Sequence, residues 1–197
     1  MHRWSAFGAV VAAVVAPALP GSRALAQDKP DARQIADAVS PLPEPMREGA
    51  TVMGYRGHDL VVLRNGTNGM ICLADDPARE GFHTSCYHNS LEPFMERGRA
   101  LRREGLSAEG TDSVRLAELE SRQLPLPPAG AALHSLFHDD GAFDPATGAT
   151  DGLRALSVVY LPYATEDATG ISATPARDRP WLMYPGKPTA HVMIPRR

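Results

Sequence analysis

The sequence predicts an α+β fold: a single small domain with an antiparallel sheet, two or three short helices and long loops. Three observations support this prediction. Apolar residues recur at helical spacing in a few short stretches, whereas β-branched residues concentrate in others. The chain also contains 18 prolines and 17 glycines but only 6% aromatic residues, which is typical of many turns. Because the helical stretches lie between pairs of predicted strands, the helices are expected to pack on one antiparallel sheet.

The N-terminal residues have the order of a secretory signal peptide. Arg3 precedes an apolar stretch over 6–18, and Ala24-Leu25-Ala26 matches an A-x-A cleavage site. The apolar stretch is shorter than the roughly 20 residues that span a bilayer. We therefore predict a signal peptide over 1–26, cleavage after Ala26, and one globular domain over 27–197, located in the bacterial periplasm or exterior.

Composition restricts the partners of this domain. The formal net charge is −3, and the predicted cleavage would make it more negative, since the removed segment is basic. An acidic chain lacks the excess of Lys and Arg that non-specific nucleic-acid binding needs. No later apolar stretch is long enough for a membrane span. An unknown small molecule or an envelope protein is the expected partner, with no nucleic acid and no membrane span in the mature chain.

The first half of the domain is predicted to contain one helix and one hairpin. Residues 31–39 have apolar residues on one side of a helix. The stretches 59–64 and 70–73 flank 65–69, an Asn- and Gly-rich turn, so they are expected to pair as a β-hairpin. Residues 75–89 are polar and contain Pro and Gly, which predicts a loop.

The second half is predicted to contain two helices and several strands. Apolar residues recur at helical spacing up to Gly105, a typical C-terminal stop. The arginines on this helix are interpreted as complements of its dipole. The predicted helices are 90–104 and 112–122, and the predicted strands are 131–138, 153–163, 181–184 and 191–194.

Cys72 and Cys86 are the only cysteines, and both lie in the part predicted to be exported. In an oxidising compartment, an even number of cysteines at short spacing predicts a disulfide. Closing a loop of about 15 residues stabilises a fold by roughly 3 kcal/mol. The pair is therefore predicted to be structural and not a thiol nucleophile.

Two segments carry a resemblance to a family. One is Arg64–Cys72 (RNGTNGMIC) with Cys86 downstream, and the other is Trp181 followed by His191–Ile194. In order and approximate spacing, the chain resembles uncharacterised small secreted bacterial proteins. That resemblance implies a common fold over the mature length, and it implies no activity.

Histidines are the most promising candidates for chemistry. His134 and His138 lie four residues apart, so they share a face of a strand or a helix, and Asp139 follows directly. Imidazole and carboxylate groups bind divalent transition metals such as zinc, copper, iron or nickel. Two alternative metal-ligand sets are predicted: His134, His138, His191 and Asp139, or His83 and His88.

No catalytic residue can be assigned from the sequence. A G-x-S-x-G element, a Walker loop and an HExxH motif are all absent from it. Our leading hypothesis is an exported small binding domain whose site is formed by the disulfide loop, the His134 strand and the His191 segment. One alternative is a metal-dependent periplasmic enzyme that uses the histidine and aspartate cluster. A second alternative is a structural envelope protein.

Overall fold

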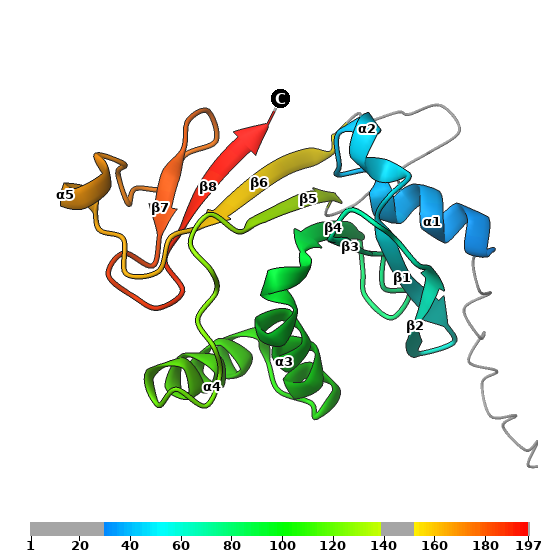
Figure 1. Cartoon of the computed structure of the whole chain (residues 1–197), viewed down its shortest axis with the longest axis horizontal. Helices are drawn as coiled ribbons and strands as arrows, with labels where there is room; N and C mark the ends of the chain where they lie inside the picture. Colours follow the sequence, from blue (N-terminus) through cyan, green and yellow to red (C-terminus); the bar gives the residue numbers. More distant parts are fainter. Residues whose placement is uncertain (1–29, 139–151, 197) are drawn as a thin grey trace, which may run out of the picture.

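The computed structural model of the chain describes residues 30–138 and 152–196. Figure 1 shows that these residues form a curved sheet with helices packed on it. In chain order the elements are α1 (Asp31–Val39), α2 (Glu44–Arg47), β1 (Thr51–Arg56), β2 (Asp59–Arg64), β3 (Met70–Leu73), β4 (Phe82–His88), the 3-10 turn η1 (Asn89–Leu91), α3 (Glu92–Arg103), α4 (Ala108–Glu120), β5 (Ala132–His138), β6 (Arg154–Tyr160), α5 (Glu166–Thr169), β7 (Trp181–Met183) and β8 (His191–Arg196). The predicted signal peptide lies outside the described residues.

The α+β class is confirmed, but the sheet is larger than predicted. All eight strands join one sheet in the order β2-β1-β3-β4-β5-β6-β8-β7. The sheet is also mixed, because β1 pairs with β3 in parallel while the other neighbours are antiparallel. The prediction of a small antiparallel sheet was therefore wrong. Within the described residues, no helix has the length and apolar character required to cross a membrane.

The predicted hairpin between 59–64 and 70–73 is wrong in its pairing. Strand β2 forms a hairpin with the preceding β1, through a tight turn at Gly57, which has a φ of 63°. Strand β3 pairs with the other edge of β1. The Asn- and Gly-rich segment instead crosses the start of β1, where the N–H groups of Thr67 and Asn68 both donate to the Gly49 carbonyl. The turn-forming sequence over 65–69 thus connects β2 to β3 across β1 and does not join a β-hairpin.

The predicted loop over 75–89 contains a strand. Strand β4 lies in the middle of the sheet, between β3 and β5. Its sequence, FHTSCYH, lacks the run of β-branched residues that favours a strand locally. Pairing on both edges stabilises the extended backbone, and this long-range contribution is invisible in a local pattern. The other predicted helices and strands lie close to the observed ones, although α4 begins at Ala108, with Ser107 as its N-cap, earlier than the predicted 112. The short helices α2 and α5 were not predicted, so the structure has more helices than the expected two or three.

One face of the sheet is covered by α1. Ala38 and Val39 of this helix pack on Val52, Cys72 and Cys86 in an apolar cluster. The predicted disulfide between Cys72 and Cys86 is confirmed, and it joins directly opposite residues of β3 and β4. It therefore ties two central strands together, not a loop to a hairpin as predicted.

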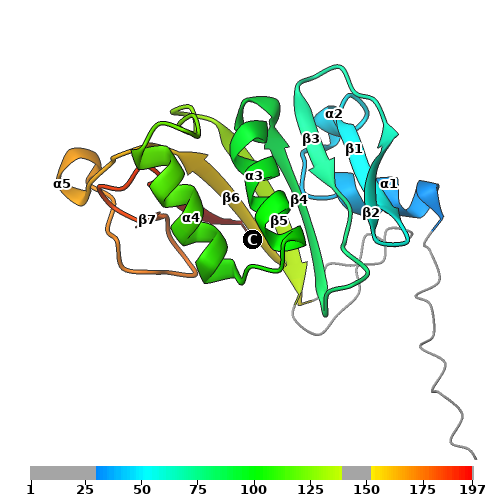
Figure 2. The same ribbon diagram turned by 90° about the horizontal axis from the view of Figure 1, so that it is seen from below.

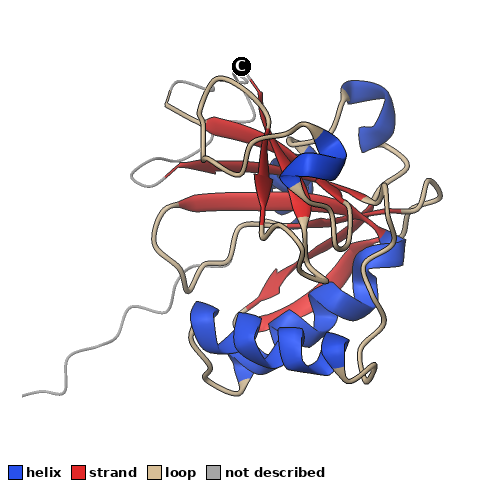
Figure 3. Ribbon diagram, turned by 90° about the vertical axis from the view of Figure 1, so that its left-hand side faces the viewer, coloured by secondary structure: helices blue, strands red, loops and turns tan. Residues whose placement is uncertain are grey.

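The opposite face is covered by α3 and α4, which lie side by side across the strands (Figure 2). Phe94 and Leu119 from these helices pack on Tyr87, Val158 and Tyr160 of the sheet. Figure 3 shows helices on both sides of the sheet, so the middle layer is enclosed where they cover it. This second face also carries a cleft, which is lined by residues of both helices and of the sheet.

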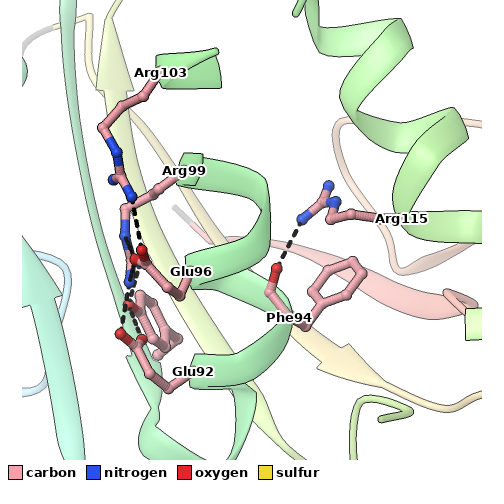
Figure 4. A network of polar contacts seen from close by, with 7 residues as sticks. Glu92, Phe94, Glu96, Arg99, Arg103 and Arg115 are labelled. Atoms are coloured by element: carbon pink, nitrogen blue, oxygen red, sulfur yellow. Dashed lines mark hydrogen bonds and ion pairs between the residues drawn. The ribbon is translucent and has the colours of Figure 1, made fainter. Parts of the chain in front are cut away.

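A buried arginine attaches α3 to the sheet (Figure 4). The Arg99 guanidinium, only 8% exposed, donates to the Tyr87 hydroxyl at 2.7 Å and to Glu92 at 2.6 Å. Its Nε donates to Glu96 at 2.9 Å, and the Tyr87 hydroxyl donates to Glu92 at 2.6 Å. Three of the α3 arginines form ion pairs: Arg97 with Glu118, Arg99 with Glu92 and Glu96, and Arg103 with Glu96. Each polar group of this network has a partner, so it holds α3 in place.

Candidate binding cleft

The cleft lies between α4, the paired ends of β6 and β8, and the connection from β7 to β8. Its volume is about 580 Å³, which falls within the range of small-molecule sites. Four rings line it: Phe94 from α3, Tyr160 from β6, His191 from β8 and Tyr184 just after β7. Segments from residue 94 to residue 191 therefore contribute to one site.

The four rings form a continuous series. Tyr160 and His191 are directly opposite on β6 and β8, and their ring centroids are 5.2 Å apart. Phe94 contacts Tyr160 edge-on with centroids 5.9 Å apart, and Tyr184 contacts His191 in the same manner at 5.8 Å. Edge-to-face contacts of this kind stabilise aromatic groups beyond their apolar burial. The rings therefore give the cleft a rigid aromatic lining.

Two buried side chains of the cleft have unused hydrogen-bonding groups. Tyr160 is 7% exposed, and its hydroxyl has no hydrogen-bond partner among the described residues. Burial raises the pKa of Tyr160 to about 12, so the hydroxyl stays protonated. His191 is 9% exposed, and its Nδ1 lies 2.7 Å from the Thr189 carbonyl oxygen. A carbonyl only accepts, so Nδ1 carries the proton and Nε2 is left as an acceptor.

The protonation state of His191 follows from its surroundings. Burial lowers the pKa of His191, although Thr189 and the carboxylate of Asp112 oppose that shift. The imidazole is therefore neutral near pH 7, with an accepting Nε2 that no described residue uses. Neither the Tyr160 hydroxyl nor His191 Nε2 is itself buried without a partner, although most of each side chain is buried. Both atoms can therefore hydrogen-bond to a molecule bound in the cleft that they line.

Arg115 of α4 lines the cleft and contacts Phe94 of α3. Its guanidinium lies 4.0 Å from the centroid of the Phe94 ring and also donates to the Phe94 carbonyl and to Asp112. Figure 4 shows Arg115 reaching from α4 toward Phe94. Gly98 of α3 permits this approach, because a Cβ there would come within 2.8 Å of the guanidinium. Asp112 thus offsets the charge of Arg115, whose Nε is buried without a hydrogen-bond partner among the described residues.

Tyr184 stands at the opening of the cleft on a constrained turn. Its backbone has a φ of 56°, a left-handed conformation uncommon for residues other than glycine. The Lys187 N–H donates to the Tyr184 carbonyl, and the Lys187 carbonyl accepts from Tyr163. Such unusual conformations persist where neighbouring contacts impose them, and they concentrate at functional sites. The Tyr184 side chain is 42% exposed, so a bound molecule can reach it.

The structure separates the residues of the first predicted metal set. His134 and His138 share one face of β5, but four residues along a strand span about 13 Å. His134 lies opposite Cys86, on the α1 face, and its Nδ1 is 2.9 Å from the Ser157 hydroxyl. His191 belongs to the other face, with Tyr160. Asp139 lies outside the described residues, so its place relative to the histidines is not described.

The second predicted set is also dispersed. His83 and His88 lie five residues apart on β4, so successive side chains alternate and these two point to opposite faces. His83 contacts Phe137 edge-on, and His88 lies 2.7 Å from the Ser90 hydroxyl. Over the described residues, no group of three or more His, Cys, Asp or Glu side chains is arranged to hold a metal ion. Among the predicted site residues that the structure describes, only His191 lines the cleft.

Sequence reasoning missed most of the cleft. Phe94 was predicted only as part of a helix, Tyr160 as part of a strand, and Arg115 was not singled out. The one local signal was Tyr184-Pro185-Gly186, a turn sequence that carries an aromatic residue.

Comparisons with known proteins add no identity: no family model, no curated protein and no solved structure matches the chain.

Proposed function

We propose that this protein is an exported binding domain of the bacterial periplasm or exterior, which binds a small organic molecule in the cleft between α4 and the β6–β8 edge. The observation that carries the proposal is the combination of Tyr160 and His191. Both side chains are more than nine-tenths buried, both line the cleft, and both keep a hydrogen-bonding atom without a partner among the described residues.

The other properties of the cleft support binding over catalysis. Its lining combines aromatic and apolar side chains with charged and hydroxyl groups that could orient a ligand. A nucleophile next to a base is the usual sign of covalent catalysis. Ser113 and Thr189 are the aliphatic alcohols that line the cleft, and neither hydroxyl is hydrogen-bonded to His191 among the described residues. The geometry of the described residues therefore favours a binding domain over the metal-dependent enzyme that the sequence suggested as an alternative.

Export of the domain is supported by two features. The segment over 1–26 has the composition of a signal peptide. The Cys72–Cys86 disulfide is of a kind that persists in oxidising compartments such as the periplasm. Sequencing the N-terminus of the protein recovered from a bacterial periplasmic extract tests this part, and a mature start at Gln27 is expected.

Binding in the cleft can be tested by blocking it. We would screen the mature protein against a library of small organic fragments by saturation-transfer NMR and map the hits by amide shifts. We expect hits to shift the resonances of residues 183–191. Ser113→Trp places a bulky ring at the cleft wall without removing Tyr160 or His191, so it should abolish those shifts.

The matched control is Ala117→Trp, which adds the same ring at an exposed position of α4 that does not line the cleft. It should keep the fragment shifts. Amide spectra of both variants would verify that they fold. Fragments that bind elsewhere, or that bind Ser113→Trp unchanged, would contradict the proposal.

A further inference from the structure

We propose that the molecule bound in the cleft is a neutral, hydroxyl-rich one, a small saccharide, stacked on Tyr184 and hydrogen-bonded to Tyr160 and His191. This inference rests on the proposed binding function and deepens it by naming the class of ligand. Four observations lead to it. Tyr160 and His191 are uncharged, several lining groups only accept hydrogen bonds, the charged lining residues balance, and the Tyr184 ring is exposed.

The buried end of the cleft disfavours a charged group. Tyr160 and His191 are both neutral near pH 7, and Arg115, the nearest cation of the wall, is engaged by Asp112 and by the Phe94 ring. A carboxylate or ammonium placed there would lose its hydration without gaining a full counter-charge, which is costly. The group that enters deepest is therefore uncharged.

The available hydrogen-bonding atoms call for a ligand that donates as well as accepts. His191 Nε2 only accepts, and so do the carboxylates of Glu109 and Asp112 at the cleft wall. The Tyr160 hydroxyl can do either, and the Lys187 ammonium only donates. Hydroxyl groups satisfy both kinds of partner, because each one donates once and accepts twice.

The charged residues that line the cleft do not select for a charged ligand. Glu109 and Asp112 stand on the α4 side, while Arg115 and Lys187 bring equal positive charge. Arg115 and Asp112 are already paired with each other. The carboxylate of Glu109 and the ammonium of Lys187 remain, and neither forms an ion pair with a described residue. Both can hydrogen-bond to hydroxyl groups.

Tyr184 supplies the stacking surface. It is held edge-on against His191 and remains 42% exposed on its constrained turn. The C–H faces of a sugar ring are apolar, whereas its edges carry hydroxyls, so it can lie on an aromatic ring while its edge reaches Tyr160 and His191. A rigid tyrosine presents such a surface at a low cost in conformational entropy.

The test uses defined probes on the folded mature protein. We would titrate it with glucose, N-acetylglucosamine, maltose and cellobiose, and with 4-hydroxybenzoate as a charged aromatic competitor, following amide shifts by NMR. We expect at least one saccharide to bind at residues 183–191 and to bind more tightly than 4-hydroxybenzoate. Tyr160→Phe should weaken that saccharide about 10-fold, the equivalent of one hydrogen bond.

Tyr184→Ala should weaken the same saccharide by about 10-fold through the loss of stacking. Tyr163→Ala is its matched control, because Tyr163 is also exposed, also has a positive φ of 64°, and does not line the cleft. It should bind normally. If organic fragments bind the cleft but no saccharide does, or 4-hydroxybenzoate binds more tightly, the ligand class is wrong and the binding domain stands. If neither fragments nor saccharides bind, both proposals fail.

Discussion

Tyr87 and Tyr160 belong to the same apolar cluster beneath α3 and α4, yet their hydroxyls differ in hydrogen bonding. The Tyr87 hydroxyl accepts from Arg99 and donates to Glu92, whereas that of Tyr160 has no partner among the described residues. Burial raises the pKa of both phenols, so the contrast is not one of charge.

The difference distinguishes the Tyr87 network, whose polar groups bond to one another, from the cleft at Tyr160, where polar groups can bond to another molecule. Around Tyr87, polar groups stabilise the packing of α3 on β4. Around Tyr160 lies the cleft, where the Tyr160 hydroxyl and His191 Nε2 have no partner among the described residues. Four experiments would break or sharpen this comparison, and they follow in order of expected effect.

The largest loss of stability should come from the disulfide on the opposite face. Replacing both cysteines, as Cys72→Ala with Cys86→Ala, should lower the free energy of unfolding by about 3 kcal/mol, because the unfolded chain is no longer constrained. Urea unfolding monitored by circular dichroism would measure it. Fragment binding in the cleft should persist, since these residues lie on the α1 face. Dithiothreitol should destabilise only the parent protein, and a loss below about 1 kcal/mol would contradict the structural role.

Arg99→Met should cost about 2 kcal/mol, because it leaves the Tyr87 hydroxyl and Glu92 without their charged partner. Arg103→Met is the matched control on the same helix. The Arg103 side chain is 62% exposed, and Glu96 is its ion-pair partner among the described residues, so its loss should cost less than about 0.5 kcal/mol. Equal losses in the two variants, measured by urea unfolding, would show that Arg99 does not hold α3 in place.

The two tyrosines can be compared by the same substitution. Tyr87→Phe should lower the free energy of unfolding by about 1 kcal/mol, since Arg99 and Glu92 each lose one hydrogen-bond partner while keeping their own ion pair. Tyr160→Phe should change it by less than about 0.5 kcal/mol, because the hydroxyl has no hydrogen-bond partner among the described residues to lose. Thermal or urea unfolding of both variants gives the result. A larger loss at Tyr160 than at Tyr87 would reverse the comparison.

The smallest effect concerns pH. Burial lowers the pKa of His191 below its ordinary value of 6.5, so the unfolded chain binds this proton more readily than the folded chain. Stability should therefore be complete above pH 6.5 and fall as the pH drops toward the lowered pKa. Asp112 opposes this shift, and the neighbouring Tyr160 and Tyr184 rings carry no charge in that range.

His134 shows the same direction of shift, caused mainly by burial, so the test needs a difference measurement. We would compare urea unfolding of the parent protein and His191→Gln at pH 7.5 and pH 5.5. The variant should lose less stability on acidification than the parent. An identical loss in both would show that His191 does not contribute to the pH dependence.

Local sequence patterns were sufficient wherever a segment carries its own signal. The helix predicted over 31–39 is α1, because its apolar side is complete within nine residues. The predicted strands at 131–138 and 153–163 contain β5 and β6, and the cysteine spacing was enough to predict the disulfide. These features depend on contacts within one segment or on a single pair of side chains.

Tertiary structure alone decided the rest. Strand β4 exists because β3 and β5 pair with both of its edges, and β2 pairs with β1 although a turn-forming sequence follows it. The cleft joins Phe94, Arg115, Tyr160, Tyr184 and His191, which are neighbours only after β6 pairs with β8 and α4 packs across them. Conversely, His134 and His191 looked like partners in the sequence and lie on opposite faces of the sheet. The register of strand pairing determines which face a side chain occupies, and that register is set by long-range contacts.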